Sequence, residues 1–244
     1  MKLFNGTTNF GDYFGTMKPG ETFKQPELAK TLERIADKGA KEFYHGETAD
    51  LLVAQMQADK GLITKQDLNE YKVNWREPMR VDFRGNTLYT APLPSSGGIA
   101  LAQLIGIKED RAADFKGVEL NSAPYIHLLA EIEKRVFADR ADYLGDPDFG
   151  KMPVAELTDP AYIAKRAKEV NPAAISATEK VKPGLEPHQT THFSIVDKDG
   201  NAVSNTYTLN WDYGSGVVVK GAGFLLNDEM DDFSSKPGVA NAFG

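Results

Sequence analysis

The sequence contains no cysteine, which excludes disulfide bonds, thiolate metal ligands and a cysteine nucleophile. It has no run of about 20 apolar residues that could cross a bilayer, and residues 1–20 contain no apolar stretch of the length that a signal peptide needs. Basic runs are also absent, and 28 basic against 35 acidic side chains give a net charge of −7. The chain is therefore not expected to bind nucleic acid or an anionic membrane.

What is present is the composition of a globular protein, because 41% of the 244 residues are hydrophobic and 26% are charged. This length is enough for one large domain or two small ones with a sizeable core. Residues 1–24 are rich in aromatics and glycine and are predicted to form an irregular loop. Thr64 and Asp67 resemble a capping box that opens a short helix. Apolar spacing and turn signals predict helices over 26–39, 48–60 and 122–143, a helix that begins near Ile99, and hairpin strands at 79–83 and 87–90.

A second hairpin is predicted around the turn at residues 198–200, with strands at 191–197 and 201–210. Two registers fit the sequence. A two-residue turn would place Thr191 opposite Thr208, whereas a three-residue turn would place Thr190 opposite Thr208. The second register is favoured because glycine readily adopts the positive φ that Gly200 would need in such a turn.

Thr190 can become a catalytic N-terminus only if the chain is cut before it. A threonine hydroxyl needs a nearby base, and a free α-amino group is one such base. Residues 171–189 contain three prolines and no clear period, which is typical of a loop accessible to cleavage. In the favoured register the Cβ atoms of Thr190 and Thr208 lie about 4.5–5.5 Å apart, with Asn210 on the same face. The simpler alternative is that Thr190 and Thr191 are β-branched strand formers.

Two further segments follow this hairpin. Residues 217–219 are three valines that are expected to form a strand, and residues 227–233 form a dense acidic patch. The patch can be a solvated turn, an oxygen-only metal site or a receptor for a substrate ammonium group. Composition favours the solvated turn, and no metal site is predicted.

Seven motifs that follow one another along nearly the whole chain resemble those of the γ-glutamyltransferases, also called glutathione hydrolases. They are 61–64 (GLIT), 94–98 (PSSGG), 138–140 (ADR), 143–149 (YLGDPDF), 189–194 (QTTHFS), 197–201 (DKDGN) and 230–234 (MDDFS). This family belongs to the N-terminal nucleophile hydrolase superfamily. The order and length of the motifs make the resemblance specific, whereas a Thr-Thr-His triplet alone would not.

The resemblance implies an α+β fold, the αββα four-layer sandwich of N-terminal nucleophile hydrolases, incomplete at both ends. It implies self-cleavage between Gln189 and Thr190. Residues 1–189 would then be the C-terminal part of a large subunit, and residues 190–244 the N-terminal part of a small subunit. The two subunits, made from one precursor, would form a heterodimer.

The resemblance also assigns roles to individual residues. Thr190 matches the nucleophile, and Thr208 matches a second threonine that hydrogen-bonds to it. Asn210, Glu229 and Asp232 match the residues that hold the α-amino end of the glutamyl group. The implied donors are glutathione and other γ-glutamyl compounds, and the acceptors are water, amino acids or dipeptides. No cofactor is implied, and the implied location is periplasmic or extracellular.

Some features of the family are expected to lie outside this chain. The arginine that clamps the glutamyl α-carboxylate would lie upstream, and the serine pair and oxyanion-hole glycines would lie downstream of Gly244. Because each missing oxyanion donor costs about 3–4 kcal/mol of transition-state stabilisation, the chain alone is expected to be inactive. Two alternatives stay open, namely an inactive scaffold with this fold and a related acylase that removes another group, such as a β-lactam side chain.

Overall fold

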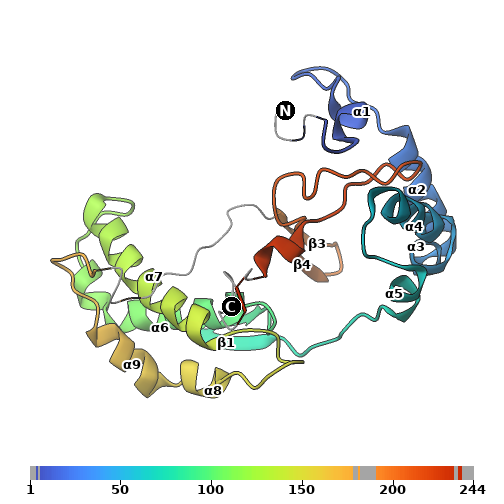
Figure 1. Ribbon diagram of the computed structural model, residues 1–244. Coiled ribbons are helices and arrows are strands. Elements are labelled where there is room, and N and C mark those ends of the chain that lie inside the picture. The colour runs from blue at the N-terminus through green and yellow to red at the C-terminus, as the bar shows by residue number, and fades with distance from the viewer. Residues whose placement is uncertain (1–3, 5, 178–180, 182–190, 234–235, 238–244) are drawn as a thin grey trace. The chain divides into compact units, whose positions relative to one another are not determined.

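The computed structural model describes residues 4, 6–177, 181, 191–233 and 236–237. The predicted mixture of helices and strands is confirmed (Figure 1). Contacts divide the chain into two compact units. The first unit comprises residues Met1–Asn74 and Pro187–Asp231, and the second comprises Trp75–Glu186 and Asp232–Gly244. The predicted division at residue 189 concerns a cleavage, so these units do not test it.

The helices of the first unit largely follow the predicted signals. Their bounds are α1 (Phe10–Phe14), α2 (Pro26–Lys38), α3 (Ala40–His45), α4 (Glu47–Asp59) and α5 (Lys65–Glu70). Pro26 opens α2, and Gly39 at φ +67° follows its last residue. The capping box of α5 is confirmed, because Thr64 accepts from the Asp67 amide and the Asp67 carboxylate accepts from the Thr64 amide.

The predicted loop at residues 1–24 is wrong in one part, because it contains the helix α1. Phe10 and Phe14 lie one helical turn apart and stack with ring centroids 4.8 Å apart. Both rings are buried and pack around Val218, which is 0% exposed. This burial stabilises a helix too short to persist alone.

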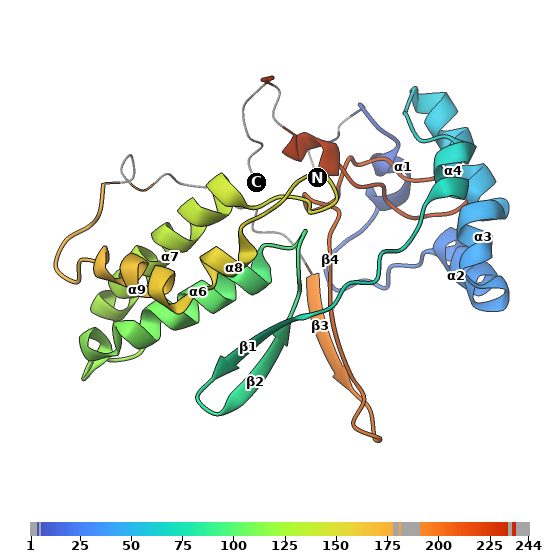
Figure 2. The ribbon, with the colours of Figure 1, turned by 90° about the horizontal axis from the view of Figure 1, so that it is seen from below.

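The core of the first unit joins segments that are far apart in the sequence. Side chains of α4 and α5 pack against residues 219–222, and the cluster comprises Ala49, Leu52, Met56, Leu68, Val219 and Ala222. Figures 1 and 2 both show the orange segment that follows β4 running beside the blue helices of this unit. A stretch near the C-terminal end of the chain is therefore embedded among N-terminal helices.

The second unit consists of one hairpin and a group of helices. Its elements are β1 (Met79–Phe83), β2 (Asn86–Thr90), α6 (Gly97–Asp110), η1 (Ala112–Phe115), α7 (Ala123–Tyr143), α8 (Val154–Leu157) and α9 (Pro160–Lys168). The strands pair with Phe83 opposite Asn86, and Arg84 and Gly85 both have positive φ. That is a two-residue primed turn, the type that suits the twist of a hairpin. The predicted strand at 87–90 therefore begins one residue earlier.

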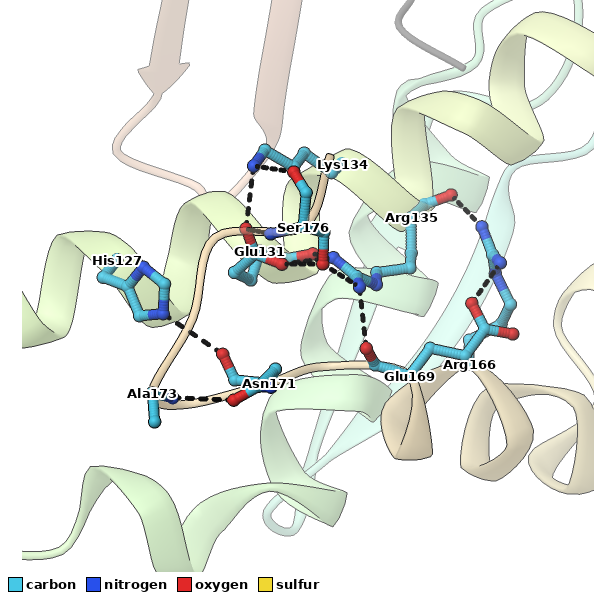
Figure 3. A network of polar contacts seen from close by, with 9 residues as sticks. All are labelled: His127, Glu131, Lys134, Arg135, Arg166, Glu169, Asn171, Ala173 and Ser176. Atoms are coloured by element: carbon cyan, nitrogen blue, oxygen red, sulfur yellow. Dashed lines mark hydrogen bonds and ion pairs between the residues drawn. The ribbon is translucent and has the colours of Figure 1, made fainter. Parts of the chain in front are cut away.

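A buried charged network fixes the chain after α9 to α7 (Figure 3). The Glu131 carboxylate, 1% exposed, accepts hydrogen bonds from Lys134 Nζ and Arg135 NH1, both at 2.7 Å. It also accepts from the Ser176 amide at 3.0 Å and from the Ser176 hydroxyl. The Arg135 guanidinium also donates a hydrogen bond to the Glu169 carbonyl at 2.7 Å. Glu169 and Ser176, which lie on either side of the start of the predicted linker at residue 171, are thus tied to a helix that is itself packed in the core.

The stability of the full-length protein is expected to fall in acid because of Glu131. Burial raises the pKa of this carboxyl, but hydrogen bonds from Lys134, Ser176 and Arg135 outweigh burial and lower the pKa from 4.5 to about 2. A carboxyl whose pKa is lowered on folding stabilises the protein above the unfolded value, and this contribution disappears as the pH falls from about 4.5 to about 2.

Urea unfolding between pH 7 and about pH 2 measures this effect against a Glu131→Gln variant. The variant is expected to lose roughly 3 kcal/mol at pH 7, because it leaves the buried Arg135 guanidinium without its counter-charge. It should also show a smaller loss on acidification than the wild type. Equal slopes for the two proteins would show that Glu131 does not carry the effect.

The strands of the described residues form two separate two-stranded sheets, β1 with β2 and β3 with β4. β3 covers Thr191–Val196 and β4 covers Ala202–Tyr207. The strand expected at residues 217–219 is wrong, because the only pairing found there in the described part of the chain is the isolated bridge between Val218 and Leu225. Side chains, rather than a neighbouring strand, bond part of the backbone of this segment.

Candidate active site

The hairpin that would carry the nucleophile has the register favoured by the sequence. The pairs run from Thr191 opposite Tyr207 to Val196 opposite Ala202, and Gly200 has φ +84°. Asp197 stabilises the turn because its carboxylate accepts from the amides of Asp199 and Asn201, each at 2.9 Å. Hydrogen bonds from Asn201 lead the interactions that lower the pKa of Asp197.

Gln189 and Thr190 lie outside the described residues. The pairing of Thr190 with Thr208 therefore stays a prediction, reached by continuing the observed register by one step beyond Thr191 and Tyr207.

Asn210 is not part of the returning strand, which ends at Tyr207 and not at residue 210 as predicted. The Asn210 amide donates to the Thr208 hydroxyl at 2.9 Å, and Asn210 has φ +78°. This left-handed backbone and the local side-chain bond compete with strand pairing. Asn210 is buried, at 4% exposed, and its side chain donates to the Asp228 carbonyl at 3.3 Å.

The acidic patch forms a turn that the chain around Asn210 holds in place. Its last residues make the 3-10 helix η3 (Glu229–Asp232), in which Glu229 is exposed and Asp232 is partly buried. Asp228 bonds this turn to the preceding loop, because its amide donates to the Leu209 carbonyl at 3.1 Å and its carboxylate accepts from the Trp211 amide at 3.1 Å. The structure therefore connects Thr208 and Asn210 by hydrogen bonds to Asp228, which directly precedes Glu229 in the acidic turn.

The sequence did not indicate the contact between Asp228 and Trp211. The Trp211 indole also donates to Asp231 at 3.3 Å, so Trp211 contacts the acidic turn both through its backbone amide and through its side chain. No periodic pattern in the sequence predicts such contacts, because they join two irregular segments. The contact with the buried Asn210 is what distinguishes Asp228 from the other acidic residues of the patch.

His192 is a second side chain without an assigned role at the sequence level. Its Nδ1 hydrogen-bonds with the Thr206 hydroxyl at 2.7 Å, and its Nε2 lies 3.2 Å from the Ser204 hydroxyl. Strand alternation places His192 and Thr206 on the same face as positions 190 and 208. A polar, hydroxyl-rich face thus leads toward the predicted nucleophile.

Among the residues that the structure describes, no group of three histidine, cysteine or acidic side chains is placed to hold a metal ion. In the same part of the chain, no helix combines the length and apolar character needed to cross a membrane.

Comparison with known proteins identifies sequences and structures similar to this chain. Residues 4–244 match the family model described as gamma-glutamyltranspeptidase. The chain is 86% identical over 242 residues to a glutathione hydrolase proenzyme of Pseudomonas aeruginosa, covering 99% of this chain and 43% of that protein. It is 37% identical over 230 residues to an acylase ACY 1 proenzyme of Pseudomonas sp. strain V22, covering 92% and 40%.

Among solved structures, a gamma-glutamyltranspeptidase from Pseudomonas nitroreducens complexed with L-DON matches with a TM-score of 0.71 and 83% identity. The match covers 75% of this chain and 55% of that one. The chain spans less than half the length of the two curated relatives described above.

Proposed function

Because the chain belongs to the gamma-glutamyltranspeptidase family, we propose that its full-length protein cleaves glutathione and related γ-glutamyl amides. The γ-glutamyl group passes to water or to the amine of an amino acid or dipeptide. The observation that carries this proposal is the hydrogen bond from the buried Asn210 side chain to Asp228, within the turn that bears Glu229 and Asp232. A donor with a free α-ammonium group is the kind of substrate that such a turn recognises.

The first step is a self-cleavage that creates the catalytic amine. The Thr190 hydroxyl attacks the carbonyl carbon of Gln189, and the amide nitrogen takes up a proton and leaves as the α-amine of Thr190. The acyl group is left as an ester on the threonine oxygen. Water hydrolyses this ester, which gives a carboxylate at Gln189 and returns the hydroxyl to Thr190. Thr208, opposite Thr190 in the continued register, orients that hydroxyl.

The new amine then serves as the base in each turnover. A free α-amino group has a pKa of about 7.7–8.0, so roughly a tenth to a sixth of it is unprotonated at pH 7, which is enough for it to act as a base. It takes the proton of its own hydroxyl as the oxygen attacks the γ-amide carbon of the donor. The proton passes to the leaving amine, and a γ-glutamyl ester of Thr190 remains. Water or an acceptor amine then attacks the ester and frees the hydroxyl.

The full-length protein is proposed to complete the four-layer αββα sandwich around the two hairpins. An isolated two-stranded hairpin is marginally stable in water, and one face of β3 and β4 exposes apolar side chains. Ile195 and Val203 lie opposite each other on this face, and their side chains are 55% and 54% exposed. The rings of Phe193 and Tyr207, which pack edge to face, lie beside them. Such a face needs a further layer to cover it. The two pieces left by cleavage form a heterodimer, with a periplasmic or extracellular location and no cofactor.

A donor assay on purified full-length protein tests this function. Release of aniline from a γ-glutamyl anilide is expected, and a dipeptide acceptor should divert product from glutamate to a γ-glutamyl dipeptide. A glutaryl amide of a β-lactam nucleus, which lacks the α-ammonium group, tests the acylase alternative. Faster turnover of the glutaryl compound would favour an acylase, and turnover of neither compound by a cleaved protein would favour an inactive scaffold. The chain of 244 residues alone serves as the inactive reference.

A further inference from the structure

Residues 217–226 form a short hairpin-like segment, called here the plug. The Val219 amide donates to the Phe224 carbonyl and the Leu226 amide donates to the Val217 carbonyl, both at 2.9 Å. The tip of the plug enters the first unit between α1, α2 and α4. All of these contacts lie within the first unit, so they do not depend on the second one.

Three apolar side chains at the tip of the plug are completely buried against N-terminal residues. Val218, Val219 and Ala222 are each 0% exposed and belong to the two clusters built on α1 and on α4 with α5. The backbone also comes unusually close to α2. Gly223 has φ +76°, and a Cβ there would lie 2.6 Å from the Leu28 amide nitrogen. Only glycine fits this contact without displacement of the helix.

Two amide side chains bond the plug backbone as a strand would. The Asn9 side chain accepts from the Val218 amide at 2.9 Å and donates to the Val218 carbonyl at 2.8 Å. On α4, the Gln55 side chain accepts from the Lys220 amide at 3.1 Å. Buried backbone groups need such partners, because an unpaired one costs the free energy of its lost hydration.

Two residues of α2 also form hydrogen bonds with the backbone of the plug. The Glu27 carboxylate accepts from the Gly221 amide at 2.9 Å, and the buried Thr31 hydroxyl donates to the Ala222 carbonyl at 2.8 Å. The backbone is therefore bonded at four positions between 218 and 222, each time by a side chain that precedes residue 190. At Val218 the Asn9 side chain therefore takes the place that a second neighbouring strand would occupy.

The plug leads directly into the acidic turn. The Leu226 carbonyl accepts from the amide and hydroxyl of Ser215, each at 3.1 Å, and Asn227 follows at once. The Asn227 side-chain oxygen accepts a hydrogen bond from the Glu229 amide at 3.0 Å. A displacement of the plug would therefore move the start of the acidic turn, which carries Glu229.

We propose that the plug is the contact through which the N-terminal piece holds and positions the recognition turn of the C-terminal piece after cleavage. Asn9 and Gln55 are then positioning residues for the donor, although they lie on the other side of the cut from the turn. This inference rests on the proposed cleavage before Thr190. It assigns a role in donor binding to residues that do not contact the donor.

Gln55→Leu and Asn9→Ala in the full-length, self-cleaved protein test this proposal. Each variant should lower the urea concentration at which the two pieces separate, as followed by size-exclusion chromatography and native mass spectrometry. The KM for a γ-glutamyl anilide should rise roughly fivefold per lost hydrogen bond while kcat changes less. Gln57→Leu, at an exposed position of the same helix, should match the wild type.

The proposal is overturned if Gln55→Leu behaves like Gln57→Leu in both separation and KM. If cleavage itself fails, the proposed function is contradicted, and hydrogen exchange in the uncut chain still decides the role of the plug. Gln55→Leu should then accelerate exchange at the Lys220 amide and also at Glu229 in the turn. Faster exchange at Lys220 alone would contradict positioning of the turn.

Discussion

Thr190→Ala in the full-length protein is expected to abolish self-cleavage and to lower donor turnover by at least about 10³-fold. The hydroxyl that attacks Gln189 and the oxygen that carries the glutamyl ester are the same atom, so one substitution removes both reactions. The α-amine base is lost as well, because it exists only after the cut. Intact mass spectrometry should therefore show one uncut chain, and an anilide assay should show background rates.

Thr191→Ala is the matched control for this experiment. Thr191 pairs with Tyr207 and, by strand alternation, its side chain lies on the opposite face from position 190. It should be cut and active at close to wild-type levels. Thr190→Ser, which keeps a hydroxyl, should be cut at a reduced rate. Cleavage in Thr190→Ala, or its loss only in Thr191→Ala, would show that the nucleophile has been assigned to the wrong threonine.

The elements that the sequence predicted best are those with local causes. Helix α2 is bounded by Pro26 and Gly39, and α5 has a capping box, and both signals act within a few residues of the element that they bound. The register of β3 with β4 also follows from a local feature, the positive φ of Gly200 in its turn. Turn chemistry near 200 therefore predicted pairings up to nine residues away.

Two of the elements that the sequence did not predict correctly depend on distant partners. Three consecutive valines favour a strand by propensity, but their segment is bonded by Asn9 and Gln55, more than 160 positions away along the chain. The helix α1 likewise depends on packing against Val218. A sequence read for periodicity contains no sign of either contact, because each joins single side chains to irregular backbone.

In the candidate site, too, local features could be predicted from the sequence and contacts between distant segments could not. Strand alternation placed Asn210 on one face with Thr208, and the structure keeps the two in contact by a different route, through the Asn210 amide and the Thr208 hydroxyl. The resemblance to a family directed attention to Glu229 and Asp232. The contact of Asn210 with Asp228 is what the fold adds, because it brings the loop after β4 and the acidic turn together.

Asp232→Asn is expected to lower kcat/KM for a γ-glutamyl anilide by about 10- to 100-fold, the effect of losing one hydrogen bond to a charged group. The substitution keeps the size of the side chain but removes the charge that attracts the donor α-ammonium. Most of the change should be in KM, because the ammonium group is bound in the ground state as well as in the transition state. Steady-state kinetics with a γ-glutamyl and a glutaryl anilide measure the effect.

The glutaryl donor separates recognition of the ammonium group from general damage, because it lacks that group. Asp232→Asn should leave its low rate unchanged, so the preference for the glutamyl donor over the glutaryl donor should shrink by the same factor. Asp212→Asn removes a charge from an exposed position near the same loop and should alter neither donor. An equal loss on both donors would mean that Asp232 supports the fold of the turn, and the selection of α-amino donors would then have to rest on Glu229 and Asn210.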